Sequence, residues 1–433
     1  MSRSDQHPIA AKARREQRMS DRGAGSEFRT GLPALIFATL GVALGYAALP
    51  YFIGNLIIPL QTEFGWNRGD VTLTGLWSAV GLAVALPFVG ALADRRGTRF
   101  VSLIFIPLFA LTVLGLFFFN GPLALFLAWY ALIGVVGAGV STVIYAKVVA
   151  HAFDKSRGFA LGILAAGLGA VGLIFPTLMG TVVAEWGWRH VYLVMAILAV
   201  VPLVALAFTR NLQRAVTPAQ AAALPGMTPR QALRTREFWT LLVVFVLLGW
   251  ALLSMVPHFI PLLIDSGVDP VQAAMLSSLV GVGTLVARPI LGWLFDRIYA
   301  IHVAVPVFLL AAVGFVALIF GGTALAPLTA LLVGIAFGAE IDLISYLSTR
   351  YLGKRAFGVL YGLIYSAFSI GGALGPVAAG YLFAAQGTYQ TALIISIVLL
   401  VVSVVMLVTL PRYDRGRYEE AVPTETTEPV IAR

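Results

Sequence analysis

Long apolar segments separated by short polar breaks follow one another along almost the whole chain. Most are as long as the roughly 20 apolar residues that a helix needs to cross a bilayer. A water-soluble protein could not cover this much apolar surface, because 59% of the 433 residues are hydrophobic and only 11% are charged. The pattern therefore predicts an all-α membrane protein with the lipid bilayer as its solvent. Its twelve transmembrane helices are expected at residues 32–60, 70–92, 100–119, 122–151, 157–184, 189–209, 237–264, 270–294, 302–320, 324–349, 356–384 and 389–410.

The positive charges indicate how these spans are oriented. Of the 29 Lys and Arg residues, only Arg68 and Arg189 fall in loops on one side of the spans, while Lys147 and Arg288 fall inside spans. All the others lie on the side that holds both termini. Positively charged loops face the cytoplasm, so we expect a multi-pass protein of the cytoplasmic (inner) membrane with both termini in the cytoplasm. The net charge of +9 is then a topology signal and does not predict a nucleic-acid partner.

The second half of the chain repeats the first at a nearly constant offset. At offsets of 200 to 202 the following residues recur: Gly90, Asp94 and Arg95 as Gly292, Asp296 and Arg297, and Gly162, Gly172 and Pro176 as Gly362, Gly372 and Pro376. We therefore expect two pseudo-symmetric six-helix halves, 32–209 and 237–410, joined by a cytoplasmic loop at 210–236. Cytoplasmic tails, 1–31 and 411–433, flank them. This arrangement places a substrate site between the halves, near the middle of the membrane.

One copy of the repeat carries a charge that the other lacks. Val84–Gly90 matches Val286–Gly292, but Arg288 stands where the first copy has Leu86. A cation at this depth costs about 2.5–3.5 kcal/mol on insertion scales, so it is rarely retained without a use. A guanidinium offers a planar fork of donors that matches a carboxylate. Arg288 thus predicts binding of a small organic monoanion; the alternative is a structural arginine paired permanently with an acid in span 324–349.

That span holds two carboxylates, Glu340 and Asp342, which are the only ones deep in any span. Residues two apart lie about 200° apart on a helix, so the two acids face different directions. Gly334, Gly338 and Asp342 form one stripe that permits close helix approach, which makes Asp342 the expected ionic partner of Arg288. Burial disfavours a charged carboxylate and a nearby guanidinium favours it. These opposing effects suit a proton carrier, a role open to either acid; a static pair remains the alternative.

Residues 90–99, GALADRRGTR, resemble the loop motif between spans 2 and 3 of the major facilitator superfamily. With the twelve spans and the repeat, the resemblance covers nearly the whole chain and implies the major facilitator fold. It also implies that the motif residues hold a cytoplasmic gate. The gating residues expected from it, including those of a degenerate second copy, are Asp94, Arg95, Arg99, Asp296 and Arg297.

A narrower resemblance concerns the monocarboxylate porters and the oxalate/formate antiporters. Residues 153–167 are similar to the span 4–5 motif of monocarboxylate transporters, Arg288-Pro289 resembles their span 8 motif, and residues 338–353 resemble bacterial relatives. Two departures matter: Thr284 stands where an Asp is expected, and span 11 has no second cation for a dianion. The resemblance implies a secondary active transporter that moves a monocarboxylate by alternating access, with a proton as second partner. An oxalate/formate-type exchanger, a drug or metabolite exporter and a membrane sensor are the alternatives.

Polar and aromatic residues complete the expected site. Asn55, Tyr361 and Tyr365 are candidates to bind substrate beside Arg288; the alternative role for Asn55 is to satisfy a neighbouring backbone group. His258 lies between two prolines in span 237–264, where we expect an irregular helix and a solvated histidine at the outer end of the cavity. The chain has no Cys and its five His are scattered, so we expect no metal site and no cofactor. No nucleophile triad is visible, so we do not expect an enzyme. The protein is expected to be monomeric.

Overall fold

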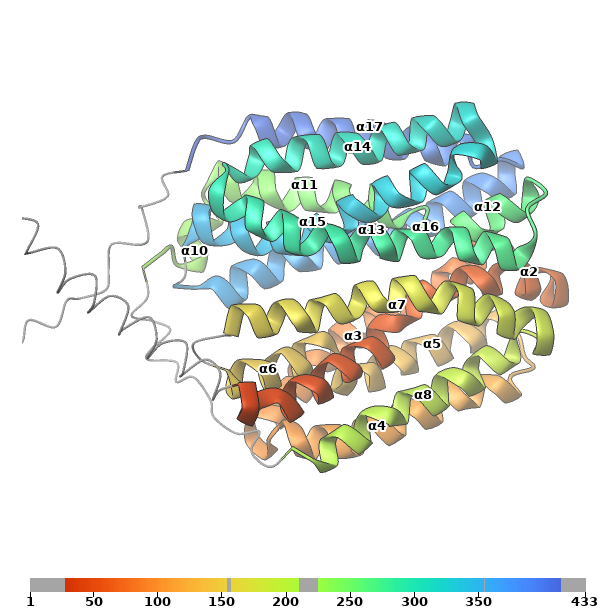
Figure 1. The fold of residues 1–433 in the computed structure, drawn as a ribbon, viewed down its shortest axis with the longest axis horizontal. Helices are drawn as coiled ribbons and strands as arrows, with labels where there is room; N and C mark the ends of the chain where they lie inside the picture. The colour runs from red at the N-terminus through yellow and green to blue at the C-terminus, as the bar shows by residue number, and fades with distance from the viewer. Residues whose placement is uncertain (1–27, 154–156, 210–224, 354, 414–433) are drawn as a thin grey trace, which may run out of the picture.

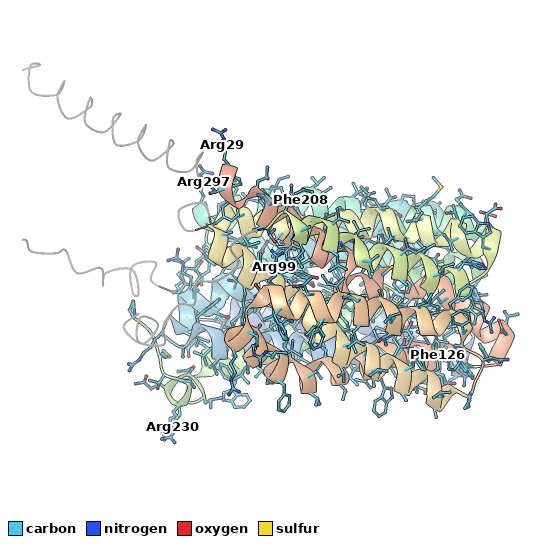
Figure 2. All side chains as sticks on the ribbon, turned by 90° about the horizontal axis from the view of Figure 1, so that it is seen from below. Arg29, Arg99, Phe126, Phe208, Arg230 and Arg297 are labelled. Carbon is cyan, nitrogen blue, oxygen red and sulfur yellow. The ribbon has the colours of Figure 1, made fainter. Side chains whose placement is uncertain are left out.

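A computed structural model describes residues 28–153, 157–209, 225–353 and 355–413. These residues are almost entirely helical and form a bundle of helices that run along its long axis (Figure 1). Within the described ranges the only β-type pairing is an isolated antiparallel bridge between Gly226 and Gly353. Phe28 and Tyr413 lie at one end of this bundle, which we call the terminal end; Arg29, Arg230 and Arg297 lie there too (Figure 2).

The first half of the bundle begins with the helix Phe28–Leu44. It continues with η1 (Tyr46–Tyr51), α2 (Ile53–Phe64), α3 (Arg68–Arg96), α4 (Thr98–Gly115), η2 (Leu116–Phe118), α5 (Leu123–Gly137), η3 (Ala138–Val140), α6 (Thr142–Ala152), α7 (Arg157–Trp186) and α8 (Arg189–Ala207). The second half comprises α10 (Pro229–Ala232), α11 (Arg236–Leu253), α12 (Phe259–Asp265), α13 (Pro270–Arg297), α14 (Ala300–Gly321), η4 (Gly322–Leu325), α15 (Ala326–Leu352), α16 (Phe357–Gln386) and α17 (Gln390–Val408).

The described residues contain ten helical stretches long and apolar enough to cross a membrane. One of these, Ala300–Leu352, joins α14 and α15. The broken first span, Phe28–Leu44 followed by η1 and α2, adds another, so the fold matches the expected twelve-span architecture. The first, fourth and seventh spans are not continuous α-helices: the fourth is interrupted by η3, and the seventh is broken between α11 and α12. Pro257 lies in that last break, as the sequence predicts.

Three helix starts follow their sequence signals. Asn67 and Asp70 form a capping box at α3, and the Asp269 side chain caps α13 ahead of Pro270. In the joining loop, Thr228 forms a capping box with Gln231 and Pro229 opens α10. This short helix ends at Ala232.

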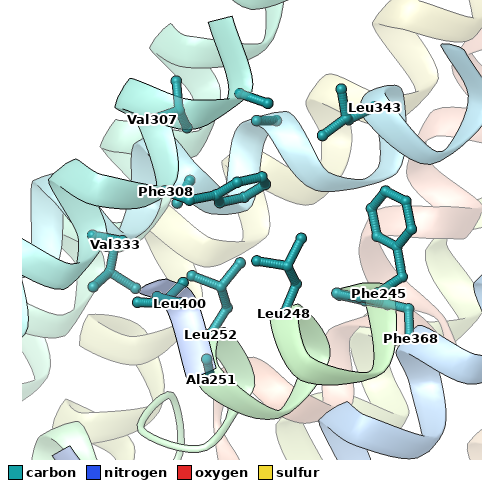
Figure 3. Close-up of a cluster of buried hydrophobic side chains, with 14 of the residues drawn as sticks. Phe245, Leu248, Ala251, Leu252, Val307, Phe308, Val333, Leu343, Phe368 and Leu400 are labelled. Atoms are coloured by element: carbon teal, nitrogen blue, oxygen red, sulfur yellow. The ribbon is translucent and has the colours of Figure 1, made fainter. Parts of the chain in front are cut away.

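Each half of the bundle has its own apolar core. One large cluster of buried side chains draws on residues 34–206 and the other on residues 232–410. Figure 3 shows part of the second, where Phe368 of α16 packs near Phe245 and Leu248 of α11. The halves meet through fewer elements: α7 packs against α13, α3 against α16, and α2 against α12. This seam between two separately packed halves is where the candidate site lies.

Candidate functional site

Arg288 occupies the seam between the two halves. Its helix, α13, packs against α7 of the first half, and its Nη1 donates a hydrogen bond to the carbonyl of Ala165 in α7 at 3.3 Å. The residue is 8% exposed, and its Nε is buried without a hydrogen-bond partner. Arg288 therefore faces the protein interior, and one of its hydrogen-bond donors is unused.

The two intramembrane acids lie beside this guanidinium. Glu340 is 2% exposed, and one of its carboxylate oxygens is buried without a hydrogen-bond partner; Asp342 is half-buried. Both interact electrostatically with Arg288. No ion pair of Arg288 within 4.0 Å occurs among the described residues. The expected Arg288–Asp342 ion pair is thus not formed, because the guanidinium extends across the seam to a carbonyl of α7.

Close packing of α13 against α15 places Glu340 and Asp342 near Arg288. A methyl group added at Gly338 would lie 2.9 Å from the Ala287 side chain, and one at Gly334 would overlap the carbonyl of Val280. Thr284 donates to the carbonyl oxygens of Val280 at 2.9 Å and Gly334 at 3.0 Å, which ties the two helices together. The small-residue stripe predicted on α15 therefore does serve close approach.

Tyrosines from both halves lie within electrostatic reach of the same charged group. Tyr361 and Tyr365 of α16 and Tyr51 of η1 all interact electrostatically with Arg288. The rings of Tyr361 and Tyr365 are stacked, with centroids 5.9 Å apart and planes 17° from parallel. The structure thus brings two of the three predicted substrate-binding partners together with Arg288.

Asn55, the third candidate, has a different setting. Its side chain is buried, and Nδ2 donates to the carbonyl of Pro176 in α7 at 3.1 Å. It therefore joins α2 to α7 and satisfies a backbone group, which is the other role open to it from the sequence. A small cavity nearby is lined by residues of both halves, among them Tyr51, Gly54 and Ser277.

An ion pair that the sequence did not predict closes the seam at the end opposite the termini. Arg68 of α3 binds both carboxylate oxygens of Asp265 in α12, at 2.5 and 2.8 Å, and donates to the Tyr389 hydroxyl at 2.9 Å. Its guanidinium also lies over the Phe383 ring, 4.0 Å from the centroid. We call Arg68, Asp265 and Tyr389 the latch. The one available signal is that Arg68 is among the two cations on that side of the spans.

His258 adjoins the latch, and its predicted solvation is wrong. The residue is fully buried, with Nδ1 3.0 Å from the Tyr389 hydroxyl and Nε2 2.8 Å from the Pro376 carbonyl. Thr72 of the first half donates to the same carbonyl at 3.2 Å. The break between α11 and α12 places His258 against α16, where this carbonyl accepts from both halves.

Glycines show that the two ends of the seam differ. Toward the end opposite the termini, a methyl group at Gly281 would overlap the backbone of Leu173, and one at Gly380 would overlap that of Gly69. On the terminal side, an added methyl group would meet no described atom within 4 Å at any of four repeat-related positions, Gly90, Gly162, Gly292 and Gly362. The halves are therefore in close contact at one end, and among the described residues these four terminal-side positions show no such contact.

Comparison with known proteins decides the family. Residues 32–376 match the family model described as Major Facilitator Superfamily. The chain belongs to this superfamily of transporters. It is 32% identical over 356 residues to an uncharacterized 38 kDa protein in the 23S RNA operon of Thermoproteus tenax, which covers 80% of this chain and 87% of that protein.

Two further matches agree with this assignment. Monocarboxylate transporter 11 of Homo sapiens is 28% identical over 401 residues, covering 88% of this chain and 82% of that protein. Among solved structures, a bacterial homolog of the human lysosomal transporter Spinster, in an inward-facing and unoccupied conformation, matches with a TM-score of 0.66 and 15% identity. That match covers 88% of this chain and 96% of the other and shows a shared fold.

The superfamily loop motif lies at the terminal end of this transporter. Arg99 donates to the carbonyl oxygens of Leu206, in the last turn of α8, and of Thr209, just after this helix, so it binds within the first half. Arg95 is exposed, and the Arg297 guanidinium lies 4.1 Å from the centroid of the Trp293 ring. The side chains of Asp94 and Asp296 lie outside the described residues, so the gating role of this set stays a prediction.

Proposed function

We propose that this superfamily member is a secondary active transporter that moves a small organic monoanion, a monocarboxylate, across the cytoplasmic membrane by alternating access. The observation that carries this proposal is the state of Arg288. It lies buried at the seam, with Nε unused and no ion pair among the described residues. A buried cation without an ion pair is costly, and a carboxylate that reaches the seam would supply one together with matching acceptors.

A proton is the proposed second partner. Glu340 lies within electrostatic reach of Arg288 and has an unpartnered carboxylate oxygen. When a substrate carboxylate binds Arg288, it neutralises the charge that favours the ionised acid, so the acid takes up a proton more readily. When the substrate leaves, the guanidinium again favours loss of that proton. Anion and proton would then move in the same direction.

The sidedness of the molecule supports a cytoplasmic position for both termini. Arg29, Arg230 and Arg297 lie at the terminal end (Figure 2), and by the positive-inside rule this end faces the cytoplasm. The halves pack closely on the opposite side, whereas on this side no described atom lies within 4 Å of a methyl group added at the four repeat-related glycines. The conformation described here would then be the one that receives substrate from, or releases it to, the cytoplasm.

An exchanger of the oxalate/formate type is less well supported by the site. A dianion calls for a second cation near the first. At the α16 positions beside Arg288 the chain has Tyr361 and Tyr365, and Tyr51 faces the guanidinium from the first half. One guanidinium with neutral hydroxyl groups suits a single carboxylate.

Uptake of labelled lactate into proteoliposomes, with and without an inward proton gradient, tests the proposal. We expect the unaltered protein to accumulate lactate when the gradient is imposed, and Arg288→Gln to take up none above empty liposomes. Arg230→Gln is the matched control, because Arg230 is exposed on α10 and far from the seam; its uptake should be unchanged. Normal lactate uptake by Arg288→Gln would remove the arginine from the site and contradict the proposal.

A further inference from the structure

Aromatic rings form a ladder along α16. Phe357, Tyr361 and Tyr365 are spaced four residues apart, which places them on one side of the helix. The centroids of Phe357 and Tyr361 are 5.3 Å apart with planes 26° from parallel, and those of Tyr361 and Tyr365 are 5.9 Å apart at 17°. Three nearly parallel rings therefore follow one another toward the arginine.

The ladder faces the seam and not the lipid. Tyr365 interacts electrostatically with Tyr46 and Tyr51, both of the first half, as well as with Glu340 and Arg288. Electrostatic interactions with groups of both halves indicate that the Tyr365 side chain lies near the seam. Phe368, which packs into the core of the second half (Figure 3), lies next to Tyr365, with ring centroids 6.2 Å apart.

Tyr365 is unusually open for an aromatic side chain in the interior of a bundle. Tyr365 is 38% exposed, whereas Phe368, three residues further along, is 5% exposed and Phe245 is fully buried. Gly362 lies three residues before Tyr365 on the same side of the helix, and no described atom would lie within 4 Å of a methyl group added there. Ring surface and free space therefore occur together, close to the one guanidinium of the site.

We infer that the preferred substrate is a monocarboxylate that carries an aromatic ring. This inference rests on the proposed function: the carboxylate binds Arg288, and the ring covers the Tyr365–Tyr361 surface. Aromatic rings attract one another beyond the effect of the area they bury. A small hydroxy acid such as lactate would use the guanidinium and leave the ladder uncovered. Ring-bearing acids should therefore bind more tightly than the small acids that share their head group.

Three acids with the same head group form the test: lactate, and the phenyllactate and cyclohexyllactate that carry a ring on its methyl carbon. We expect proton-driven uptake of phenyllactate with a Michaelis constant at least about tenfold below that for lactate, because a buried ring adds a large apolar area. Cyclohexyllactate has similar bulk without a π-system and should fall between the two. A Michaelis constant for lactate equal to or below that for phenyllactate would overturn the inference and leave the proposed function standing. If the unaltered protein transports none of the acids, the proposed function fails together with the inference.

Two variants locate the effect. Tyr365→Leu removes the ring and should raise the Michaelis constant for phenyllactate about two- to tenfold while changing that for lactate less than twofold. Tyr365→Phe keeps the ring and should restore the preference. Phe320→Leu is the control, because Phe320 is 86% exposed on α14; it should change neither constant. Equal effects of Tyr365→Leu on both acids would show a structural role and overturn the inference. If the Tyr365→Leu protein does not fold, the comparison of the three acids in the unaltered protein decides whether the inference holds.

Discussion

At the scale of single residues, the proposed role of Arg288 depends on the planar geometry of its guanidinium as well as on its charge. A lysine would supply the same charge as a point, but not the planar fork that binds both oxygens of a carboxylate. We therefore expect Arg288→Lys to retain measurable lactate uptake with a Michaelis constant raised about tenfold or more, since loss of a charge-assisted hydrogen bond costs about 1.5–3 kcal/mol. Concentration-dependent uptake in proteoliposomes measures this. An unchanged constant would mean that the charge alone is recognised.

Glu340 and Asp342 are distinguished by burial. Glu340 is 2% exposed with an unpartnered oxygen, whereas Asp342 is half-buried, so we expect Glu340 to carry the proton. Glu340→Gln should exchange labelled for unlabelled lactate at a normal rate but should not concentrate it under a proton gradient. Asp342→Asn serves as the matched comparison and should still concentrate lactate. The assignment is wrong if Glu340→Gln accumulates lactate while Asp342→Asn does not.

Sequence predicts some of these residues well and others poorly, for a simple reason. Arg288 and Glu340 stand out because a charge within an apolar run is rare and costly. Arg68 and Asp265 do not, because both lie near span ends where charges are ordinary, and they are 197 residues apart. Only the fold shows that they meet. The prediction of an Arg288–Asp342 ion pair was wrong, because the stripe of small residues gives the direction of Asp342 but not the path of the long, flexible arginine side chain.

At the scale of helices, span positions were predictable and span breaks only in part. Pro87, Pro176, Pro289 and Pro376 all lie inside continuous helices, since neighbouring helices satisfy the backbone groups that a proline frees. The first span nonetheless breaks near Pro50. Local sequence does not separate these cases, because the outcome depends on which neighbour accepts or donates the freed hydrogen bond.

The glycines of α13 allow a prediction at this scale. A methyl group at Gly281 would overlap the backbone of α7, whereas one at Gly292 would meet no described atom within 4 Å. Overpacking typically costs about 1–3 kcal/mol, so Gly281→Ala should lower the thermal unfolding midpoint by several degrees. Gly292→Ala should leave it unchanged or slightly raised, because alanine favours a helix. Thermal unfolding of the two purified variants in detergent measures this, and equal midpoints would contradict the tight α7–α13 contact.

At the scale of the whole molecule, the repeat extends from sequence to contacts. The carbonyl of Pro176 accepts from Asn55, and that of its repeat partner Pro376 accepts from His258; each donor follows the break in the first span of its half. Among the described residues, the second of these carbonyls alone also accepts from the other half, through Thr72. The architecture and the seam were predictable from the repeat. The side on which the seam is closed was not, because under the proposed alternating access the same sequence must adopt states closed at either end.

The latch is an ion pair between the two halves at the closely packed end, and we expect it to favour closure there. Arg68 and Asp265 join the two halves, so Asp265→Asn weakens closure without touching the transport site. Losing a hydrogen bond to a charged group in a partly exposed pair shifts the balance between the closed and open states of this end by about 1–2 kcal/mol, or about five- to thirtyfold.

Because the chain has no Cys, a single Ser277→Cys in the cavity between the halves reports opening. A membrane-impermeant maleimide added at the end opposite the termini should label it faster in Asp265→Asn. Glu63→Gln is the control, since Glu63 pairs with Arg189 at the same end but within one half. If both variants label at the rate of the parent, the ion pair does not hold the halves together.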